Sequence, residues 1–235
     1  GDGLDDIVAR TSGGEWWVAR ATGSGFNNEY WGRWSSSVLW EDLQLADVTG
    51  DGRQDIIGRA DGNWWVGAST GSAFATSYWG RWSNSVTWED VSVADFNNDG
   101  RDDIAGRANG QWWVSLSQET FFLTQYWGKW SNSVTWEDVS VGDFDGDGID
   151  DIAGRANGRW WISQSTGSFF STAYWGIWST SVTWDDVLVA DVNGDQRADL
   201  LGRVNGTWWV SRSTGSFFLT EKWANWSNTV TWDTV

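Results

Sequence analysis

Hydrophobic and polar positions along the chain follow one pattern that recurs every 48 residues. In one copy, residues 139–144 alternate apolar side chains with small or polar ones, which is typical of a half-buried strand. Residues 145–150 are rich in glycine and aspartate and predict a tight loop. Residues 151–156 and 159–165 predict a second and a third strand.

Turn signals separate these strands. Asn157-Gly158 is the strongest two-residue signal for a hairpin, and Thr166-Gly167 marks the next turn. Residues 168–178 are rich in Phe, Tyr and Trp and predict a fourth strand. Four consecutive antiparallel strands in a repeat of about 40 to 50 residues are typical of one blade of a β-propeller. The main alternative, a β-solenoid, has shorter coils and lacks hairpin turns of the Asn-Gly kind.

The copies are nearly identical in sequence. Residues 82–93 and residues 130–141 read the same twelve letters. Such similarity indicates recent duplication or deliberate construction, and it predicts that any function is present several times. Five copies predict an all-β, five-bladed β-propeller of four-stranded antiparallel blades, in a single domain over residues 1–235. Each copy contains one pair of adjacent tryptophans, at Trp16-Trp17, Trp64-Trp65, Trp112-Trp113, Trp160-Trp161 and Trp208-Trp209.

The ends of the chain do not coincide with repeat boundaries. The first hairpin has one extra residue, and the six residues equivalent to 92–97 are missing between Val235 and Gly1. We therefore predict that the two termini share one blade. Residues 230–235 would supply a shortened innermost strand whose pairing with the N-terminal strands closes the ring.

Composition narrows the possible functions. The chain has no Cys and no His, so thiolate metal sites and the usual catalytic base are absent. The formal net charge of -17 argues against nucleic acid and favours binding of cations. No run of about 18 apolar residues occurs, so we expect no membrane insertion. We expect a monomer that is extracellular or secreted, with its signal outside this sequence.

The acidic residues concentrate in one loop of each repeat. Oxygen-bearing side chains stand at loop positions 1, 3, 5 and 9, whereas a plain turn needs only one Asp or Asn. A hard cation such as Ca²⁺ takes oxygen ligands from alternate residues of a loop and a backbone carbonyl at position 7. The predicted ligands are Asp47, Thr49, Asp51, Arg53 and Asp55; Asp95, Asn97, Asp99, Arg101 and Asp103; Asp143, Asp145, Asp147, Ile149 and Asp151; and Asp191, Asn193, Asp195, Arg197 and Asp199.

These loops are not expected to be equal. The loop at Asp143 has four Asp ligands and should bind Ca²⁺ most tightly, whereas the loop at Asp47 has Thr49 at its third position. Gln196 replaces a glycine and should strain a left-handed backbone. The first copy retains only Asp2 and Asp6, which makes that site half built. We therefore expect about four Ca²⁺ sites and an incomplete fifth.

Residues 93–104, Val-Ala-Asp-Phe-Asn-Asn-Asp-Gly-Arg-Asp-Asp-Ile, and their copies resemble FG-GAP/VCBS repeats. Such repeats form the blades of the integrin α-chain propeller and of many secreted bacterial proteins. The resemblance covers all five repeats and implies that the loop joins the first two strands of a blade and binds a structural Ca²⁺. Propellers of that family usually have more blades, and the Trp-rich half of each repeat lies outside the family motif.

Every copy contains five tryptophans. Trp64 and Trp65 should point to opposite faces of their strand, because side chains alternate along a strand. Blades pack face to face, so we expect most indoles in the core between blades. Arginines that recur nearby, at positions 10, 59, 107, 155 and 203, are candidates for stacking on indole faces.

One or two tryptophans of each repeat are expected to stay exposed in the grooves between blades. Sugar rings can pack their C–H faces on indoles there while their hydroxyls bond to Asn, Ser and Arg. Lectins with integrin-like propellers bind sugars in such grooves, which is an analogy at the level of the fold. The candidates come from the Tyr-Trp-Gly-x-Trp segments: Tyr78, Trp79, Trp82, Tyr126, Trp127, Trp130, Tyr174, Trp175 and Trp178.

Three functions remain open. The symmetry of the repeats favours a multivalent binding module for glycans or a cell-surface ligand, acting as a lectin or in adhesion. A structural scaffold with no ligand beyond Ca²⁺ fits near-identical copies equally well. A glycoside hydrolase needs two carboxylates in different environments at one site. The other acidic pairs, such as Glu41-Asp42 and Glu89-Asp90, instead recur in each blade, so we expect no enzyme.

Overall fold

The computed structural model describes residues 3–227 and residue 230. These residues form 19 strands in five antiparallel sheets. No helix that could span a membrane occurs among them. The strands are β1 (Ile7–Arg10), β2 (Glu15–Ala21) and β3 (Phe26–Arg33); β4 (Glu41–Ala46), β5 (Asp55–Ala60), β6 (Asn63–Ser69) and β7 (Phe74–Arg81); β8 (Glu89–Ala94), β9 (Asp103–Ala108), β10 (Gln111–Ser117) and β11 (Phe122–Lys129); β12 (Glu137–Gly142), β13 (Asp151–Ala156), β14 (Arg159–Ser165) and β15 (Phe170–Ile177); and β16 (Asp186–Ala190), β17 (Asp199–Val204), β18 (Thr207–Ser213) and β19 (Phe218–Asn225).

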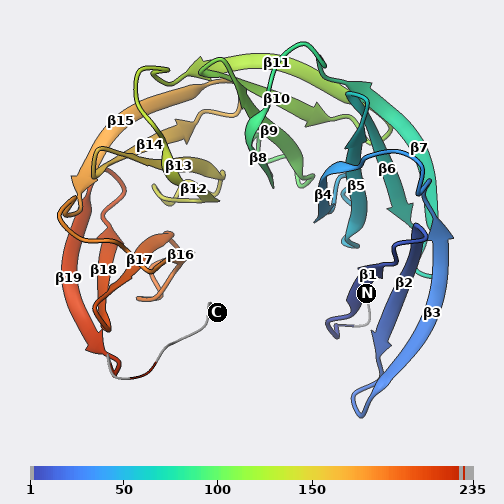
Figure 1. The fold of residues 1–235 in the computed structure, drawn as a ribbon, viewed down its shortest axis with the longest axis horizontal. Coiled ribbons are helices and arrows are strands. Elements are labelled where there is room, and N and C mark those ends of the chain that lie inside the picture. Colours follow the sequence, from blue (N-terminus) through green and yellow to red (C-terminus); the bar gives the residue numbers. More distant parts are fainter. Residues whose placement is uncertain (1–2, 228–229, 231–235) are drawn as a thin grey trace.

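In every sheet the strands pair in sequence order, each antiparallel to the next. Strands β4, β8, β12 and β16 lie toward the centre of the molecule, and the long strands β3, β7, β11, β15 and β19 form its outer rim (Figure 1). This arrangement is that of propeller blades. The all-β class and the repeated antiparallel blades predicted from the sequence are therefore confirmed.

The fourth blade shows where the strand predictions succeed. Strands β13 and β14 cover residues 151–156 and 159–165, as predicted. Strand β12 begins earlier than predicted, at Glu137, and contains an irregularity between Glu137 and Ser140. Asp138, inside this bulge, has a φ of 51°. A bulge interrupts the alternation of faces, so the pattern of apolar residues does not reveal the start of the strand.

The five blades form an open arc (Figure 1). The sheet of β1–β3 and the sheet of β16–β19 lie at its two ends, separated by a gap wider than the spacing between neighbouring blades. The predicted closing strand, residues 230–235, lies outside the described residues except for Val230. Closure of the ring by that strand therefore stays a prediction. The first sheet has three described strands, which fits a blade whose innermost strand comes from elsewhere.

Neighbouring blades meet through a phenylalanine that lies against two tryptophans. The ring of Phe122, at the start of β11, lies 5.1 Å from the ring of Trp79 and 6.4 Å from that of Trp64, both in the preceding blade. All three side chains are buried. Aromatic side chains of this size each bury about 150–250 Å², so this contact supplies much of the junction. It recurs between Phe74 and Trp31, Phe170 and Trp127, and Phe218 and Trp175, at 5.1–5.3 Å.

A second tryptophan of each junction requires a glycine opposite it. Trp82 packs on Gly106 of the next blade, where an added Cβ would lie 2.6 Å from the indole. The Nε1–H of Trp82 donates to Ser115 Oγ at 2.7 Å, so this buried polar atom is satisfied. Trp34, Trp130 and Trp178 stand in the same way against Gly58, Gly154 and Gly202. The expectation that most indoles lie between blades is confirmed.

The recurring arginines bind carboxylates instead of stacking on indoles, so that expectation is wrong at four of five positions. Arg107 donates to Asp90 at 2.7 Å and pairs with Glu89 at 2.9 Å. Charge-assisted hydrogen bonds are stronger than a cation–π contact at a partly exposed site. Arg59, Arg155 and Arg203 make equivalent pairs. In the described part of the chain, only Arg10 lies over an indole, 6.0 Å from the ring of Trp16.

The sixth position of the acidic loops allows a test of backbone strain. Gln196 has a φ of 68°, where the other complete loops have Gly52, Gly100 and Gly148. We expect Gln196→Gly to raise the free energy of unfolding by about 1 kcal/mol, because glycine lacks the Cβ that disfavours a left-handed backbone. Chemical denaturation would measure this. Gln125→Gly, in the extended strand β11, is the control and should lower stability; a stability that falls in both variants would contradict the expectation.

Candidate functional site

Each acidic loop connects the innermost strand of a blade to its second strand. The first Asp of the loop holds the backbone around its own carboxylate: Asp47 accepts hydrogen bonds from the N–H groups of Gly50 at 2.8 Å and Gly52 at 2.7 Å. The bond from the sixth loop residue recurs at Asp95, Asp143 and Asp191, at 2.8–2.9 Å. In all four complete loops the chain therefore wraps around this first carboxylate.

The ninth loop position holds a carboxylate that is removed from water. Asp103 is fully buried, and its Oδ1 accepts a hydrogen bond from the N–H of Ser117 at 2.8 Å. Its Oδ2 is buried without a hydrogen-bond partner among the described residues. Burial raises the pKa of Asp103 to about 8, and burial likewise raises the pKa of Asp151 to about 8 and that of Asp55 to about 6. A buried carboxylate with an open oxygen requires a proton or a cation.

The loop at Asp143 brings its carboxylates closest together. One carboxylate oxygen each from Asp143, Asp145 and Asp151 lies within 4.8 Å of the others. Burial and the neighbouring carboxylates raise the pKa of Asp147 in the same loop. Oxygen ligands of Ca²⁺ stand 2.3–2.6 Å from the ion, so three oxygens this close can share one cation. The residues present therefore fit a Ca²⁺ site.

An arginine distinguishes the other three loops. Arg101, at the seventh position, donates to the fifth-position carboxylate of Asp99 at 2.7 Å. Arg197 does the same to Asp195 at 2.7 Å, and Arg53 pairs with Asp51. The loop at Asp143 has Ile149 in this place, so its own seventh residue supplies no guanidinium to the fifth-position carboxylate. The loop spacing predicts a role for the backbone carbonyl of the seventh residue but does not reveal the ion pair that its side chain makes.

Two weaker sites were expected from the sequence. Thr49, at the third position of its loop, donates its backbone N–H to Asp55 Oδ2 at 3.2 Å. In the first copy, Asp2 lies outside the described residues. Asp6 accepts a hydrogen bond from the N–H of Ala21 at 2.8 Å, the bond that ninth-position carboxylates make in the other blades. Asp6 therefore makes the same backbone contact as the ninth-position carboxylates of the other blades.

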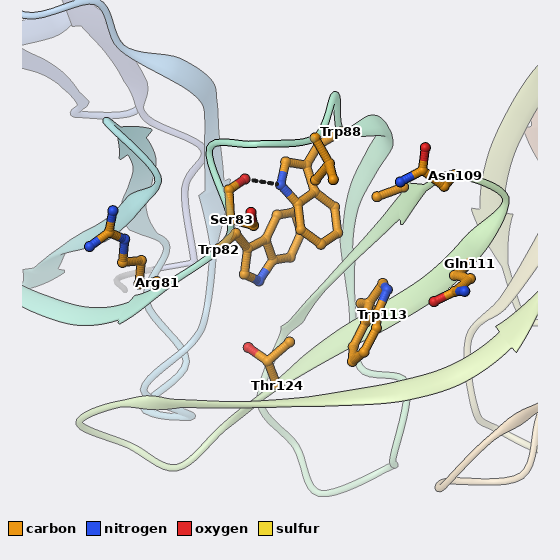
Figure 2. Close-up of a pocket in the computed structure, with 10 residues that line it drawn as sticks. Arg81, Trp82, Ser83, Trp88, Asn109, Gln111, Trp113 and Thr124 are labelled. Atoms are coloured by element: carbon orange, nitrogen blue, oxygen red, sulfur yellow. Dashed lines mark hydrogen bonds between the residues drawn. The ribbon is translucent and has the colours of Figure 1, made fainter.

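A groove opens between the second and third blades (Figure 2). Its volume is about 320 Å³, which lies at the lower end of the range for small-molecule sites. One wall comes from the chain that follows β7 and the other from strands β9, β10 and β11. The lining residues are Arg81, Trp82, Ser83, Val86 and Trp88 on the first wall and Ala108, Asn109, Gln111, Trp113 and Thr124 on the second.

Two half-buried indoles form the apolar surface of this groove. Trp88 stacks on Trp82 at 4.1 Å with a tilt of 32°, and its Nε1–H donates to the carbonyl oxygen of Ser83 at 3.0 Å (Figure 2). Trp113 stands on the opposite wall and makes an edge contact with Tyr126 at 5.7 Å. Both indoles are therefore held in place by contacts with neighbouring residues of their own wall, which leaves a fixed aromatic surface facing the groove.

The tryptophans proposed from the Tyr-Trp-Gly-x-Trp segments are not exposed, which corrects that expectation. Trp79, Trp127 and Trp175 are 1–4% exposed because the phenylalanine of the next blade covers them. Trp130 and Trp178 are also buried, and Trp82 reaches the groove only beneath Trp88. Tyr78, Tyr126 and Tyr174 are about half exposed, as expected, and lie behind the groove tryptophans rather than within it. Trp113, the second member of its Trp pair, faces the groove instead.

The same groove elements recur at the other junctions. Trp40 stacks on Trp34, Trp136 on Trp130 and Trp184 on Trp178, at 4.1–4.4 Å. Each stacked indole donates to the carbonyl oxygen of the serine five residues earlier. The four junctions therefore share an aromatic core, whereas residues at the rim differ. In place of Arg81 stand Arg33, Lys129 and Ile177, and in place of Gln111 stand Asn63, Arg159 and Thr207.

Comparison with known proteins identifies the repeat. The FG-GAP-like repeat family matches residues 47–106 and 95–154, which confirms the resemblance over two repeats. No curated protein sequence matches the chain significantly. Among solved structures, the chain is similar to an Agrocybe aegerita lectin described for specific recognition of non-reducing terminal N-acetylglucosamine, with a TM-score of 0.78 and 21% identity over 93% of this chain and 62% of that chain.

A second similar structure is the Tc holotoxin pore of Photorhabdus luminescens, with a TM-score of 0.61 and 15% identity over 94% of this chain and 11% of that chain. The chain thus spans less than two thirds of the length of either protein. At these identities the similarity concerns the fold alone. The lectin therefore supports a propeller of the same architecture as the one described above.

The raised pKa values predict how stability depends on pH in metal-free protein. In the folded state the pKa of the Asp103 and Asp151 carboxyls is raised to about 8, above the ordinary value of 3.8. Their stabilising contribution is complete below the ordinary value and is lost as the pH rises through the raised one. We therefore expect the melting temperature in chelator to fall between about pH 5 and about pH 8. Calorimetry would measure it.

Asp103→Asn is the matched control for this effect, because asparagine is neutral and similar in shape. Its melting temperature in chelator should depend less on pH than that of the unaltered protein. A melting temperature that rises with pH over this range in both proteins would contradict the expectation.

Proposed function

We propose that this chain is a Ca²⁺-stabilised, multivalent carbohydrate-binding module whose sugar sites are the grooves between its blades. The observation that carries the proposal is the pair of indoles, Trp88 and Trp113, that face the groove between the second and third blades; the stacked tryptophan recurs at the other three junctions. Recognition of N-acetylglucosamine by the similar Agrocybe aegerita lectin supports the class of ligand. A terminal sugar with an N-acetyl group is accordingly the first ligand to test.

The chemistry of the groove suits a sugar ring. Indole faces accept the C–H face of a pyranose, and Asn109, Gln111 and Thr124 supply hydrogen-bond donors and acceptors for its hydroxyls. Asn109 is the first residue of a hairpin turn, with a φ of 51°, so its position is determined by the backbone. The groove therefore combines an apolar surface with a small number of placed polar groups, as ligand sites do.

The same lining argues for binding without catalysis. None of the residues that line the groove is acidic. The nearby carboxylates of Glu89 and Asp90 are engaged by Arg107 at 2.9 and 2.7 Å. Glycoside hydrolysis requires a pair of carboxyl groups on either side of the bond that breaks. We therefore infer a binding protein that gains strength from several equivalent weak sites on a surface of repeated glycans.

Loss of one groove tests the carbohydrate proposal. A glycan array would first identify a ligand, with terminal N-acetylglucosamine as a probe. Calorimetric titration of that ligand should then show several equivalent sites, and Trp113→Ala should remove one of them, since it removes one wall of one groove. Phe169→Ala, which changes an exposed aromatic residue on a turn outside the groove, should keep the full number of sites. A blank array at high protein concentration would refute the proposal.

The Ca²⁺ proposal rests on different residues and is tested separately. Titration of chelated protein with Ca²⁺ should release or absorb heat and raise the melting temperature, because a cation that binds only the folded state stabilises it. Asp147→Asn should weaken the site expected to be tightest, whose own seventh residue is Ile149 and not an arginine. Asp61→Asn is the matched control, since the equivalent turn residues Asn109, Asn157 and Asn205 are already asparagine. No heat and no change in melting temperature would exclude Ca²⁺.

A further inference from the structure

A second cavity borders the groove that Trp88 and Trp113 line. Its volume is about 610 Å³, which lies within the range for small-molecule sites. Its walls come from the start of β8, from the end of β9 with the turn that follows, and from the chain between β11 and β12. Charged, amide and hydroxyl side chains line most of it, so we call it the polar cavity.

A buried arginine fixes the charged groups of the polar cavity. Arg107 is 7% exposed; its Nε–H donates to Asp90 Oδ2 at 2.7 Å, and its Nη2 pairs with Glu89 Oε2 at 2.9 Å. The Glu89 side chain is nevertheless 52% exposed, and its other oxygen, Oε1, has no hydrogen-bond partner in the described part of the chain. A carboxylate oxygen held in this way is a strong acceptor for the hydroxyl groups of a ligand.

Amide and hydroxyl groups complete the polar lining. Four such side chains line the cavity without a hydrogen bond to any other described residue: Thr87, Asn109, Asn132 and Thr135. Together they offer both donors and acceptors. The protein therefore leaves their hydrogen-bonding capacity to solvent or to a ligand.

One indole supplies an apolar wall to the polar cavity. Trp136 stacks on Trp130 at 4.1 Å and donates its Nε1–H to the carbonyl oxygen of Ser131 at 2.9 Å, so its position is fixed. A fixed apolar surface beside several polar groups is typical of ligand sites. It also suits a sugar ring, which carries C–H groups on its faces and hydroxyl groups at its edge.

The groove and the polar cavity are contiguous. Asn109 lines both of them and stands at the edge of the groove (Figure 2). Thr87 of the polar cavity is followed directly in the chain by Trp88 of the groove. A ligand with one ring on Trp88 and Trp113 can therefore extend past Asn109 into the polar cavity.

The same arrangement recurs on the preceding blade. A cavity of about 330 Å³ there borders the same groove through Val86 and Trp88. Three of its residues are the equivalents of residues in the polar cavity: Glu41 of Glu89, Arg59 of Arg107 and Asn84 of Asn132. Arg59 again pairs with Glu41, at 3.1 Å. A polar cavity beside an aromatic groove is thus a repeated feature of the blades.

We infer that the polar cavity binds the second sugar of an oligosaccharide whose first sugar lies on the indoles of the groove. The inference rests on the proposed function and deepens it, since the ligand is then a chain of at least two neutral sugars. Hydroxyl groups of the second sugar donate to Glu89 Oε1 and bond to the amide and hydroxyl groups of the cavity. Two carboxylates and one guanidinium give the cavity a formal charge of -1, which disfavours an acidic sugar.

A comparison of one sugar with two tests the inference. Calorimetric titration would use N-acetylglucosamine and its linear disaccharide, N,N′-diacetylchitobiose. We expect the disaccharide to bind at the same number of sites with a Kd about tenfold lower. A few additional hydrogen bonds, one of them to a charged group, have an effect of this size.

Removal of the glutamates tests whether the second sugar lies in the polar cavity. A triple variant, Glu41→Ala, Glu89→Ala and Glu137→Ala, removes this carboxylate from three blades. The three side chains are 46–52% exposed, so the variant should fold with a melting temperature close to that of the unaltered protein. Its Kd for the disaccharide should rise about tenfold. Its Kd for the monosaccharide should not change, because these glutamates do not line the groove.

Glu221→Ala is the matched control. Glu221 is also 52% exposed and pairs with an arginine, Arg212, but it lies on the outer strand β19. Its replacement should change neither Kd. A second triple variant, Thr87→Val, Thr135→Val and Thr183→Val, keeps the charges and removes hydroxyl groups from three successive blades. It should raise the Kd for the disaccharide about threefold and leave that for the monosaccharide unchanged.

The outcomes separate the inference from the proposed function. Equal binding of the two sugars to the unaltered chain overturns the inference and leaves the proposed function standing. Binding of neither sugar refutes the proposed function, and the inference falls with it. The inference also fails if half as many disaccharides as monosaccharides bind, since one disaccharide would then bridge two grooves. It fails as well if the glutamate variant keeps its affinity for the disaccharide or loses affinity for both sugars equally.

Discussion

The arc depends on the insertion of one phenylalanine between the tryptophans of the preceding blade. A sheet that is apolar on both faces is stable only when a neighbour covers each face. Phe122 and Trp79 provide that cover from opposite sides of one junction, and Gly106 lets Trp82 approach the next sheet closely. Because each blade touches only its neighbours, the repetition of this contact contributes to the regular curvature of the arc.

The acidic loops connect the same blades by polar contacts nearer the centre. The N–H of Asp102 donates to the carbonyl oxygen of Asp47 at 2.9 Å, and Ser117 Oγ donates to that of Val48 at 2.5 Å. Ser117 ends the strand β10 that carries Trp113 of the groove. A cation that orders the loop of one blade would therefore also fix the strand that forms a wall of the adjacent groove. The acidic loop and the groove are separate in space but are linked through strand β10.

The sequence predicted features that depend on local chemistry. Turn residues and alternation were sufficient for β13 and β14, and the spacing of the aspartates was sufficient for the loops. It did not predict which indoles face the groove. Trp79 and Trp113 both lie on strands and have aromatic neighbours, and the packing of the next blade determines how exposed each of them is. It also missed the pairing of Arg101 with Asp99 and the bulge at Asp138. The ion pair and the bulge depend on side-chain geometry and strand register, which cannot be read from the sequence of one repeat.

The grooves combine an aromatic surface that is repeated at each junction with rim residues that differ between junctions. The same stacked pair of tryptophans recurs at the four junctions, so this apolar surface would be constant among the proposed sugar sites. The rim changes from Arg81 to Lys129 to Ile177, and each change alters the groups available to a neighbouring sugar or linkage. A weak common site with variable rims gains strength mainly when several grooves bind at once. In the proposed function, the curvature of the arc would determine which spacings of glycans can be bound together, so the junction that stabilises the fold would also limit its ligands.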